Sequence, residues 1–398
     1  MSVHSGVFTP EDRADAVYRY LPVDVPPGCP GVTIELEYDA AQGALDLGCF
    51  GPAGFRGWSG GARRHASIAP TWATPGYLPG ELASGEWQVV LGLHRVPAEG
   101  LPWRVRVGLG APAPPPPPVL PPLPDRPPPR SLPAPRGMRW LAGDLHAHTV
   151  HSDGELTVDE LAALAVAQGL DFLAVTDHNT VSHHAHLAAA GARAGVLLLP
   201  GQEVTTHRGH ANAFGAMGWI DFRAPAEDWV EHVDRRGGLL SINHPLGADC
   251  SWRQPMVRRP ALAEIWHWTW LDRRWGGPMA WWQAWDASVV PVGGSDFHRL
   301  DQGRLPGEPT TWVLVDNGGV DAVLAGLRAG RTAVSAGRHG PVLLRLGDEL
   351  LALDAEGALL ADSTGGRRLV RSARASFVAA PGPQWLEDGQ TAILAICG

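Results

Sequence analysis

The chain of 398 residues contains no lysine, because all 32 of its basic residues are arginines. Without a lysine ammonium group, the protein cannot form a Schiff base or bind phosphate with a Walker-type lysine. It also cannot bridge metal ions with a carboxylated lysine. Only four cysteines are present, and no two of them are spaced as a CxxC pair. Their scatter excludes a zinc finger and a disulfide framework.

Long apolar runs and an excess of positive charge are missing as well. No stretch approaches the ~18 apolar residues that span a bilayer. The first residues, MSVHSGVFTP, lack the basic region and apolar run of a signal peptide, so we expect a cytoplasmic protein without a membrane segment. The formal charge of −9 argues against a binder of long nucleic acid or of anionic membranes. This net negative charge does not exclude a small anionic substrate that is held by metal ions.

The spacing of apolar residues divides the chain into four parts. Residues 1–110 read as short alternating strands separated by Gly and Pro turns, which predicts an N-terminal β-sandwich. Residues 111–136 are dominated by proline and predict an extended, semi-rigid linker. Residues 137–335 alternate strands and helices, and residues 336–398 return to short strands, which predicts a small C-terminal β-domain. We expect the third part to fold on its own core when the chain begins near Arg136.

The third part repeats one arrangement, in which an apolar strand ends in His, Asp or Glu. The segments are LDFLAVTDHN, VLLLPGQE, GGLLSINHP, ALAEIWH and VVPVGGSDFH. Functional groups on the loops that follow parallel strands are typical of a (β/α) barrel. The sequence therefore predicts an α/β fold with the functional site at the carboxyl ends of the strands.

Histidine is concentrated in this part, with 13 of the 17 histidines between positions 146 and 298. Such clustering points to metal binding or acid–base chemistry. Imidazole and carboxylate without thiolate suit Mn, Zn or Fe. The candidate ligands come from five segments: Asp144, His146, His148 and Asp153; Asp177 and His178; Glu203 and His210; His244; Asp296 and His298.

Single motifs in this set have simpler interpretations. A lone HxH pair is a weak signal, although residues i and i+2 of a strand do face the same side. His183, His184 and His186 read better as solvated or supporting residues than as ligands. The stretch Trp252–Trp285 holds eight of the 17 tryptophans and is interpreted first as packing, and second as the wall of a pocket. The order of ligand types at five strand ends is what favours a metal site.

Taken together, DLHAHTVHSDG, TDHN, GQEVTT with GH, NHP and GSDFH resemble the PHP (polymerase and histidinol phosphatase) superfamily of metal-dependent phosphoesterases. The flanking GFRGWSGGAR, ATPGYLPG and GRTAVSAGRHGP segments resemble its CehA/McbA branch. The resemblance implies a distorted (β/α)7 barrel of the PHP type, flanked by an N-terminal β-sandwich and a small C-terminal β-domain. It is strong over residues 140–300 and weaker at both ends.

The resemblance also implies a site with two to three divalent metal ions. His146, His148, Glu203 and Asp296 would hold the first ion, and Glu203, His210 and His244 the second. Asp153, His178 and His298 would hold the third. The assignment of His210 is the weakest, because His207 lies in the same segment. Asp144 and Asp177 would orient the imidazoles of the ligands.

The implied activity is hydrolysis of a small phosphorylated substrate, a phosphate mono- or diester, by a hydroxide that bridges two metal ions. Glu203, His244 and His298 are the expected catalytic residues. His267 is expected to bind the substrate, and it could also contribute to protonation of the leaving group. Arg208, Arg299 and Arg304 are either phosphate-binding residues or ordinary surface arginines. Hydrolysis of carbamates or carboxylic esters at the same site is the alternative, and a non-catalytic binding protein is a third reading.

Overall fold

A computed structural model describes residues 2–316 and 318–398. The chain divides into two compact units. The first contains Met1–Leu120 together with two short segments, His148–Thr157 and Asp177–Ala185. The second contains Pro121–Ala147, Val158–Thr176 and His186–Gly398.

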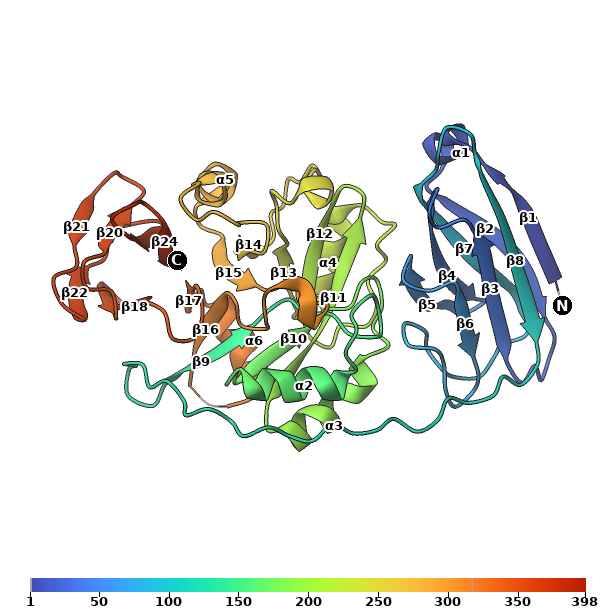
Figure 1. The fold of residues 1–398 in the computed structure, drawn as a ribbon, viewed down its shortest axis with the longest axis horizontal. Coiled ribbons are helices and arrows are strands. Elements are labelled where there is room, and N and C mark those ends of the chain that lie inside the picture. The colour runs from blue at the N-terminus through green and yellow to red at the C-terminus, as the bar shows by residue number, and fades with distance from the viewer. Residues whose placement is uncertain (1, 317) are drawn as a thin grey trace. The chain divides into compact units, whose positions relative to one another are not determined.

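The first unit is built on two antiparallel sheets of four strands each (Figure 1). One sheet has the order β1-β8-β3-β6 and the other β2-β7-β4-β5. Alternate residues of both sheets, among them Ile34, Leu47 and Leu91, are fully buried in one shared core. The elements are β1 (Ser2–Phe8), α1 (Pro10–Asp15), β2 (Tyr18–Val25), β3 (Val32–Tyr38), β4 (Ala44–Gly51), β5 (Gly54–Gly60), β6 (His65–Ile68), β7 (Gly85–Arg95) and β8 (Leu101–Leu109).

The second unit contains a long mixed sheet with the order β15-β14-β13-β12-β11-β10-β9-β16-β17-β24-β23-β20-β21. Strands β9, β10 and β11 pair in parallel, as do β13, β14 and β15. Strand β12 is antiparallel to both of its neighbours. The first strands of the unit are β9 (Arg139–Asp144), β10 (Phe172–Val175), β11 (Leu197–Thr206), β12 (Gly209–Phe214), β13 (Leu239–Ile242), β14 (Leu262–His267) and β15 (Val290–Gly294).

Helices are short and connect only some of these strands. They are α2 (Val158–Ala167), α3 (His184–Ala194), α4 (Ala226–Arg235), α5 (Gly277–Asp286) and α6 (Val320–Arg328), with 3-10 turns η1 (Ala248–Cys250) and η2 (Leu300–Gln302). The mixed α/β class predicted from the sequence is therefore confirmed. The regular alternation is not, because a tight turn with Gly209 at φ +118° sends the chain directly from β11 into β12. The order of the described strands is therefore not a simple repeat of strand and helix.

The C-terminal strands are β16 (Thr310–Val315), β17 (Thr332–Ser335), β18 (Val342–Leu346), β19 (Glu349–Leu353), β20 (Leu359–Asp362), β21 (Arg367–Leu369), β22 (Arg374–Val378), β23 (Gln384–Glu387) and β24 (Ile393–Cys397). Of these, β18, β19 and β22 form a separate three-stranded sheet, whereas the other six continue the long sheet. Strand β24 pairs with β17. Buried Trp140 and Trp312 share one core with Leu343 and Leu386, so residues 336–398 pack on the sheet that carries β9 and β16.

The proline-rich segment is attached to the second unit over residues 121–135, which we call the strap. It has no helix or strand and runs extended (Figure 1). Arg126 donates to the carbonyl oxygens of Leu170 and Gly195 at 2.6 and 2.7 Å. Arg130 donates to the carbonyl oxygens of Arg338 and Gly340 at 2.9 and 2.7 Å. Side-chain hydrogen bonds therefore attach this part of the expected linker to the second unit.

Over residues 2–316 and 318–398, no helix has the length and apolar character needed to cross a bilayer.

Candidate metal centre

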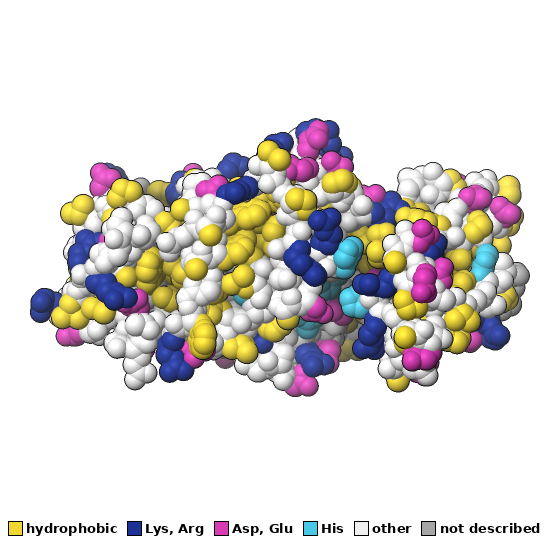
Figure 2. All heavy atoms as spheres, turned by 90° about the horizontal axis from the view of Figure 1, so that it is seen from above, with side chains coloured by type: hydrophobic (Ala, Val, Ile, Leu, Met, Phe, Trp, Pro, Cys, Tyr) yellow, Lys and Arg dark blue, Asp and Glu magenta, His cyan; other side chains and the backbone are white. Residues whose placement is uncertain are grey.

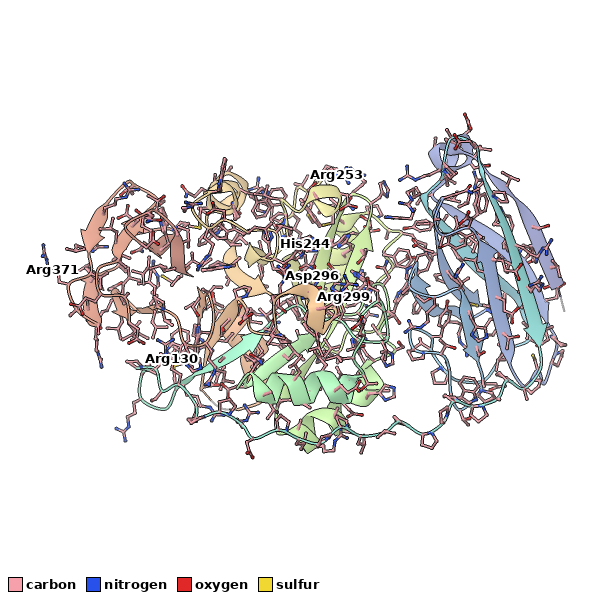
Figure 3. All side chains as sticks on the ribbon, in the orientation of Figure 1. Arg130, His244, Arg253, Asp296, Arg299 and Arg371 are labelled. Carbon is pink, nitrogen blue, oxygen red and sulfur yellow. The ribbon has the colours of Figure 1, made fainter. Side chains whose placement is uncertain are left out.

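The carboxyl ends of the parallel strands carry the candidate ligands of the second unit. Asp144 ends β9, and His146 follows two residues later. Glu203 lies on β11, whereas His244 and Asp296 are each the second residue after the end of β13 and of β15. Because parallel strands present their carboxyl ends at one edge of a sheet, these side chains converge. Figure 3 labels two of them, His244 and Asp296.

His146 lies at the centre of this group. Its Nε2 atom is 3.1 Å from Asp296 Oδ1 and 3.4 Å from Glu203 Oε2. The ligand atoms of these three residues all lie within 4.8 Å of one another. His146 and Glu203 are fully buried, and the Asp296 side chain is only 11% exposed. Two carboxylates thus face one ring nitrogen in a place with little access to water.

Two further histidines contact the other oxygen of Glu203. His210 Nδ1 is 3.1 Å and His244 Nε2 is 3.3 Å from Glu203 Oε1. The β11–β12 hairpin explains the first contact, since His210 pairs with Thr205, which shares its face of the strand with Glu203. His207 instead lies in the exposed turn. We call His146, Glu203, His210, His244 and Asp296 the Glu203 cluster.

A third carboxylate, Glu264, completes the surroundings of His146 and was missed in the sequence. Its Oε1 lies 2.7 Å from His146 Nδ1, and its Oε2 accepts the backbone N–H of His244 at 2.9 Å. Glu264 is buried in the middle of β14, where ALAEIWH reads as an ordinary strand. The signal available was a glutamate among apolar residues of a buried strand, because a buried charge needs a partner.

The chemistry of these donors fits a metal cation. Glu264 takes the Nδ1 side of His146, which leaves Nε2 directed at Glu203 and Asp296. Burial lowers the pKa of His146, but the charges of Glu264, Asp296 and Glu203 outweigh it and raise the pKa well above 6.5. Three carboxylates around one buried imidazole are unfavourable unless a positive charge compensates them. A divalent ion between imidazole and carboxylate oxygens would supply it.

Asp144 stabilises the backbone around the Glu203 cluster. Its carboxylate accepts the N–H groups of His146 at 3.0 Å, Ser295 at 3.1 Å and Gly307 at 2.8 Å. Burial raises its pKa to about 6, although these hydrogen bonds lower it. Asp144 was expected to orient imidazoles. Within the described residues it instead contacts the main chain that carries His146 and Asp296.

The first unit holds a second group, formed by His148, Asp153 and His178, which we call the Asp153 cluster. Ligand atoms of the three residues lie within 4.8 Å of one another. His178 Nε2 is 3.5 Å from Asp153 Oδ1, and the rings of His148 and His178 stack with centroids 4.3 Å apart. His148 is buried, whereas the Asp153 side chain is 44% exposed.

Asp177 holds the loop that carries this cluster. It accepts the backbone N–H and the hydroxyl of Thr149 at 2.8 and 2.7 Å, and the hydroxyl of Ser152 at 2.7 Å. His183 Nδ1 lies 3.1 Å away. Burial alone would raise the pKa of Asp177, but the nearby His183, His151 and His148 lower it to about 2. Asp177 contacts the imidazole of His183, which the sequence assigned to a supporting role.

Arg63 of the β-sandwich contacts the same loop and was also missed in the sequence. It lies between β5 and β6, and its guanidinium donates to the carbonyl oxygens of Val150 and Ser152, the latter at 2.9 Å. The backbone N–H of Gly76 donates to Ser182 Oγ at 3.0 Å. Two points of the sandwich therefore support the segments that carry Asp153 and His178. Nothing local marks these residues, because the contacts join positions about a hundred residues apart.

The remaining predicted residues lie in different surroundings. His298 is half-buried, with Nδ1 2.9 Å from the carbonyl oxygen of Asp296. Arg208 is exposed and donates to the carbonyl oxygen of Arg253 at 3.3 Å. Arg299 is exposed and pairs with Asp301 at 2.9 Å.

Arg304 and His267 lie nearer to the Glu203 cluster. Arg304 is half-buried, with its guanidinium 5.4 Å from the centroid of the Trp268 ring. Burial lowers its pKa, and the charge of Asp296 acts against that shift. His267 is buried beside Thr269 Oγ1. Burial and the charge of His244 lower the pKa of His267 to about 3, so its ring is neutral.

The backbone at two of the converging residues is strained. His244 has φ +24° and Asp296 has φ +51°, in the region that L-residues rarely adopt. Each is the second residue after a buried strand, and both direct their side chains toward Glu203 or His146. Strain of this kind persists where the surrounding structure enforces it, and it gathers at functional sites.

Comparison with known proteins identifies part of this segment. Residues 144–256 match the PHP domain family. A 5'-3' exoribonuclease of Haemophilus influenzae is 39% identical over 64 residues, which are 16% of this chain and 23% of that protein. A 3',5'-nucleoside bisphosphate phosphatase of Chromobacterium violaceum is 44% identical over 66 residues, 17% of this chain and 23% of the relative. The matched stretch thus spans about a quarter of these relatives.

Solved structures give a broader but weaker similarity. A two-domain protein of Bacteroides vulgatus, described as containing a PHP-like metal-dependent phosphoesterase, has a TM-score of 0.41 and 17% identity. The match covers 69% of this chain and 89% of that one. A protein of Bifidobacterium adolescentis, named as a putative metal-dependent phosphoesterase, has a TM-score of 0.33 and 17% identity, over 42% of this chain and 90% of that one. The similarity to the PHP domain family rests on the sequence match over residues 144–256.

Proposed function

We propose that this protein is a metal-dependent phosphoesterase, a hydrolase of phosphate mono- or diesters. The observation that carries the proposal is the Glu203 cluster, in which two carboxylates face the Nε2 atom of His146 while Glu264 takes its Nδ1 side. His146, Glu203, His210 and His244 also lie inside the stretch that matches the PHP domain. A structural ion pair would need one carboxylate, and three are present.

The proposed ligands follow the sequence motifs. His146, His148, Glu203 and Asp296 hold the first ion; Glu203, His210 and His244 hold the second; Asp153, His178 and His298 hold the third. The contacts of both Glu203 oxygens support a bridging role, because Oε1 lies near His210 and His244 while Oε2 lies near His146. Manganese, zinc and iron all accept this donor set.

The bound ions supply Lewis acidity and lower the pKa of water, which are the two requirements of phosphoester hydrolysis near neutral pH. The chain's own residues fix the geometry. Glu264 orients His146 from behind, and Asp144 fixes the backbone of His146 and Ser295. Glu203, His244 and His298 are the proposed catalytic residues, and Arg304 is the arginine best placed to counter charge near Asp296.

The substrate class is a small phosphate ester. The relatives named as a nucleoside bisphosphate phosphatase and an exoribonuclease both act on phosphoester bonds. The formal charge of −9 and the absence of lysine disfavour long polyanions. The motifs outside the matched stretch resemble the CehA/McbA branch, so carbamates and carboxylic esters are the comparison substrates.

We also propose that the strands of the PHP domain form the distorted barrel expected for this family. Support comes from an isolated parallel bridge between Ala147, beyond β9, and Phe297, beyond β15. The backbone N–H of Phe297 donates to the carbonyl oxygen of His146 at 3.4 Å. This bridge joins the first and last parallel strands of the domain next to the Glu203 cluster.

A direct assay tests the function. The purified full chain, loaded with Mn²⁺, is compared on p-nitrophenyl phosphate, bis-p-nitrophenyl phosphate and a naphthyl carbamate, with and without a chelator. We expect a higher kcat/KM for a phosphate ester, competitive inhibition by inorganic phosphate and loss of activity on chelation. Preference for the carbamate without phosphate inhibition contradicts the proposed function. Full activity with less than one metal equivalent contradicts the metal requirement.

A further inference from the structure

A pocket of about 220 Å³ opens between the end of β14, the loop after it and the start of α5, and we call it the indole pocket. Its walls are mainly carbon. They include Leu246, His267, Trp270, Leu271, Trp275 and Pro278. Hydrophobic side chains are gathered around α5 on the face seen in Figure 2. Trp270 and Trp275 belong to the stretch Trp252–Trp285, for which the sequence allowed two interpretations, packing or the wall of a pocket. These two residues form part of a pocket wall.

The indole pocket and the Glu203 cluster are linked through the paired strands β14 and β15. His267, in its wall, pairs across the sheet with Gly294. A Cβ atom on Gly294 would lie 2.2 Å from Glu264 Oε1 and 2.5 Å from His146 Cβ, so Gly294 touches the cluster. Leu246, which also lines the pocket, is two residues from His244.

A bulge in β14 produces this arrangement. The pairing with β15 shifts between Glu264 and Trp266, so Ile265 is an extra residue in the strand. Residues three apart normally point to opposite faces of a strand, but one inserted residue restores them to the same face. Glu264 and His267 therefore lie on one face, where Glu264 contacts His146 and His267 forms part of the pocket wall.

The pocket has the chemistry of an apolar binding site. Leu271 is 82% exposed and Trp275 is 75% exposed, an amount of hydrophobic surface in contact with water that favours burial by a ligand. The Trp270 indole N–H donates to the carbonyl oxygen of Trp275 at 2.7 Å, which fixes the two residues relative to each other. Asp272 pairs with Arg274, at 2.9 and 2.6 Å. Among the described residues, no arginine lines the pocket, and its one carboxylate, Asp272, would repel a phosphate group.

We propose that the indole pocket binds the aromatic leaving group of a phosphate ester whose phosphoryl group lies at the Glu203 cluster. This inference rests on the proposed function and names its substrate class. The volume suits one ring or two fused rings, since pockets for whole drug-sized ligands measure roughly 300–1,000 Å³. Indole walls favour an aromatic over an alkyl group, because ring pairs add stacking energy to the buried area.

Paired substrates test the inference in the full chain with Mn²⁺. The variants are Trp275→Ala and, as a matched control, Trp285→Ala, which removes an indole of α5 that stacks on Trp281 and is not part of the pocket wall. We expect Trp275→Ala to raise KM for 2-naphthyl phosphate about tenfold. Its kcat/KM for ethyl phosphate should change less than twofold. Equal losses on both substrates, or an equal effect of Trp285→Ala, overturn the inference.

A binding measurement separates this inference from the proposed function. Calorimetric titration of 2-naphthol into the full chain needs no hydrolysis. We expect binding by the wild type that Trp275→Ala weakens about tenfold and Trp285→Ala leaves unchanged. If the wild type hydrolyses no phosphate ester but binds naphthol in this pattern, the proposed reaction fails while the aromatic subsite stands. Equal naphthol binding by the wild type and Trp275→Ala overturns the subsite, whatever the activity.

Discussion

The guanidinium Nη1 of Arg63 lies 2.9 Å from the carbonyl oxygen of Ser152, the residue next to Asp153. Arg63 belongs to the loop between β5 and β6 of the sandwich, and Asp153 belongs to the Asp153 cluster. A second N–H group of Arg63 binds the carbonyl oxygen of Val150. A residue of the sandwich thus supports a loop with proposed metal ligands, and this residue lies outside the stretch that matches the PHP domain.

Arg63→Ala should therefore impair metal binding without changing any ligand. Supporting contacts of metal ligands are worth about 10–100-fold in metal affinity or activity. We expect a loss in that range in kcat/KM at limiting Mn²⁺, with part of the loss recovered at saturating Mn²⁺. The neighbouring Arg64→Ala is the matched control, since Arg64 donates only to the carbonyl oxygen of Tyr38 and lies over its ring. Similar behaviour of the two variants would contradict the role of Arg63.

Glu203→Gln should cost more than His298→Asn. Glu203 contacts three histidines through two oxygens, whereas His298 is proposed to bind a single ion. We expect Glu203→Gln to lower kcat by at least about 100-fold. Metal equivalents by elemental analysis and kcat on p-nitrophenyl phosphate check this. Equal, mild losses in both variants would refute the bridging role.

Glu264→Gln tests the support of His146. The amide keeps the size of the side chain but removes the negative charge that faces His146 Nδ1 at 2.7 Å. We expect metal affinity to fall about 10–100-fold, because an imidazole with a weaker acceptor behind it is a weaker ligand. Titration of the metal-free chain with Mn²⁺ measures this. Glu308→Gln is the control, at an exposed position where the carboxylate accepts the N–H of Leu305. An unchanged affinity in Glu264→Gln would show that Glu264 only fills space.

Arg130→Ala should lower stability through the strap. The side chain is 13% exposed, donates to two carbonyl oxygens, and pairs with Asp354. Its removal leaves these acceptors without their donor, at a cost of about 1–3 kcal/mol in the free energy of unfolding. Urea unfolding measures the change, and the exposed Arg136→Ala is the control. An unchanged midpoint for Arg130→Ala would show that these contacts add no stability.

The pKa of His267 predicts part of the pH dependence of stability. Burial and the charge of His244 lower it from 6.5 to about 3, so the unfolded chain takes up a proton between these values that the folded chain does not. The free energy of unfolding should fall as the pH falls from 6.5, by up to about 1.4 kcal/mol per pH unit. Metal-free His267→Gln should show a shallower decline between pH 6.5 and 4 in urea unfolding. His339→Gln, at an exposed position, should match the wild type; identical slopes in all three would contradict the assignment.

The sequence was sufficient to predict the features of the fold and of the site that depend on the local pattern of residues. Apolar strands ending in His, Asp or Glu predicted that His146, Glu203, His244 and Asp296 gather at one edge, because parallel strands force that geometry. The alternation also predicted the mixed α/β class. The hairpin β11–β12 departed from it, since Gly209 closes a turn too tight for a helix.

Glu264 and Arg63 could not be found in that way. The position of Glu264 beside His146 depends on the bulge in β14 and on the lack of a side chain at Gly294, which are properties of strand pairing. Arg63 contacts carbonyl oxygens 87 and 89 positions away, and such acceptors carry no residue-type signature. Long-range contacts to the main chain are invisible in one sequence.

The attachment of the strap has a consequence for how it can be observed. Eight of its 15 residues are prolines, which have no amide hydrogen. In the contacts of Arg126 and Arg130, guanidinium N–H groups donate to main-chain carbonyl oxygens. These hydrogen bonds involve no backbone N–H group of the strap or of the residues that it contacts. Hydrogen–deuterium exchange of the backbone would therefore register little difference between a docked and a detached strap. The slowed exchange would instead appear in the guanidinium protons of these two arginines, which makes nitrogen-15 labelling of arginine the informative isotope scheme for this chain.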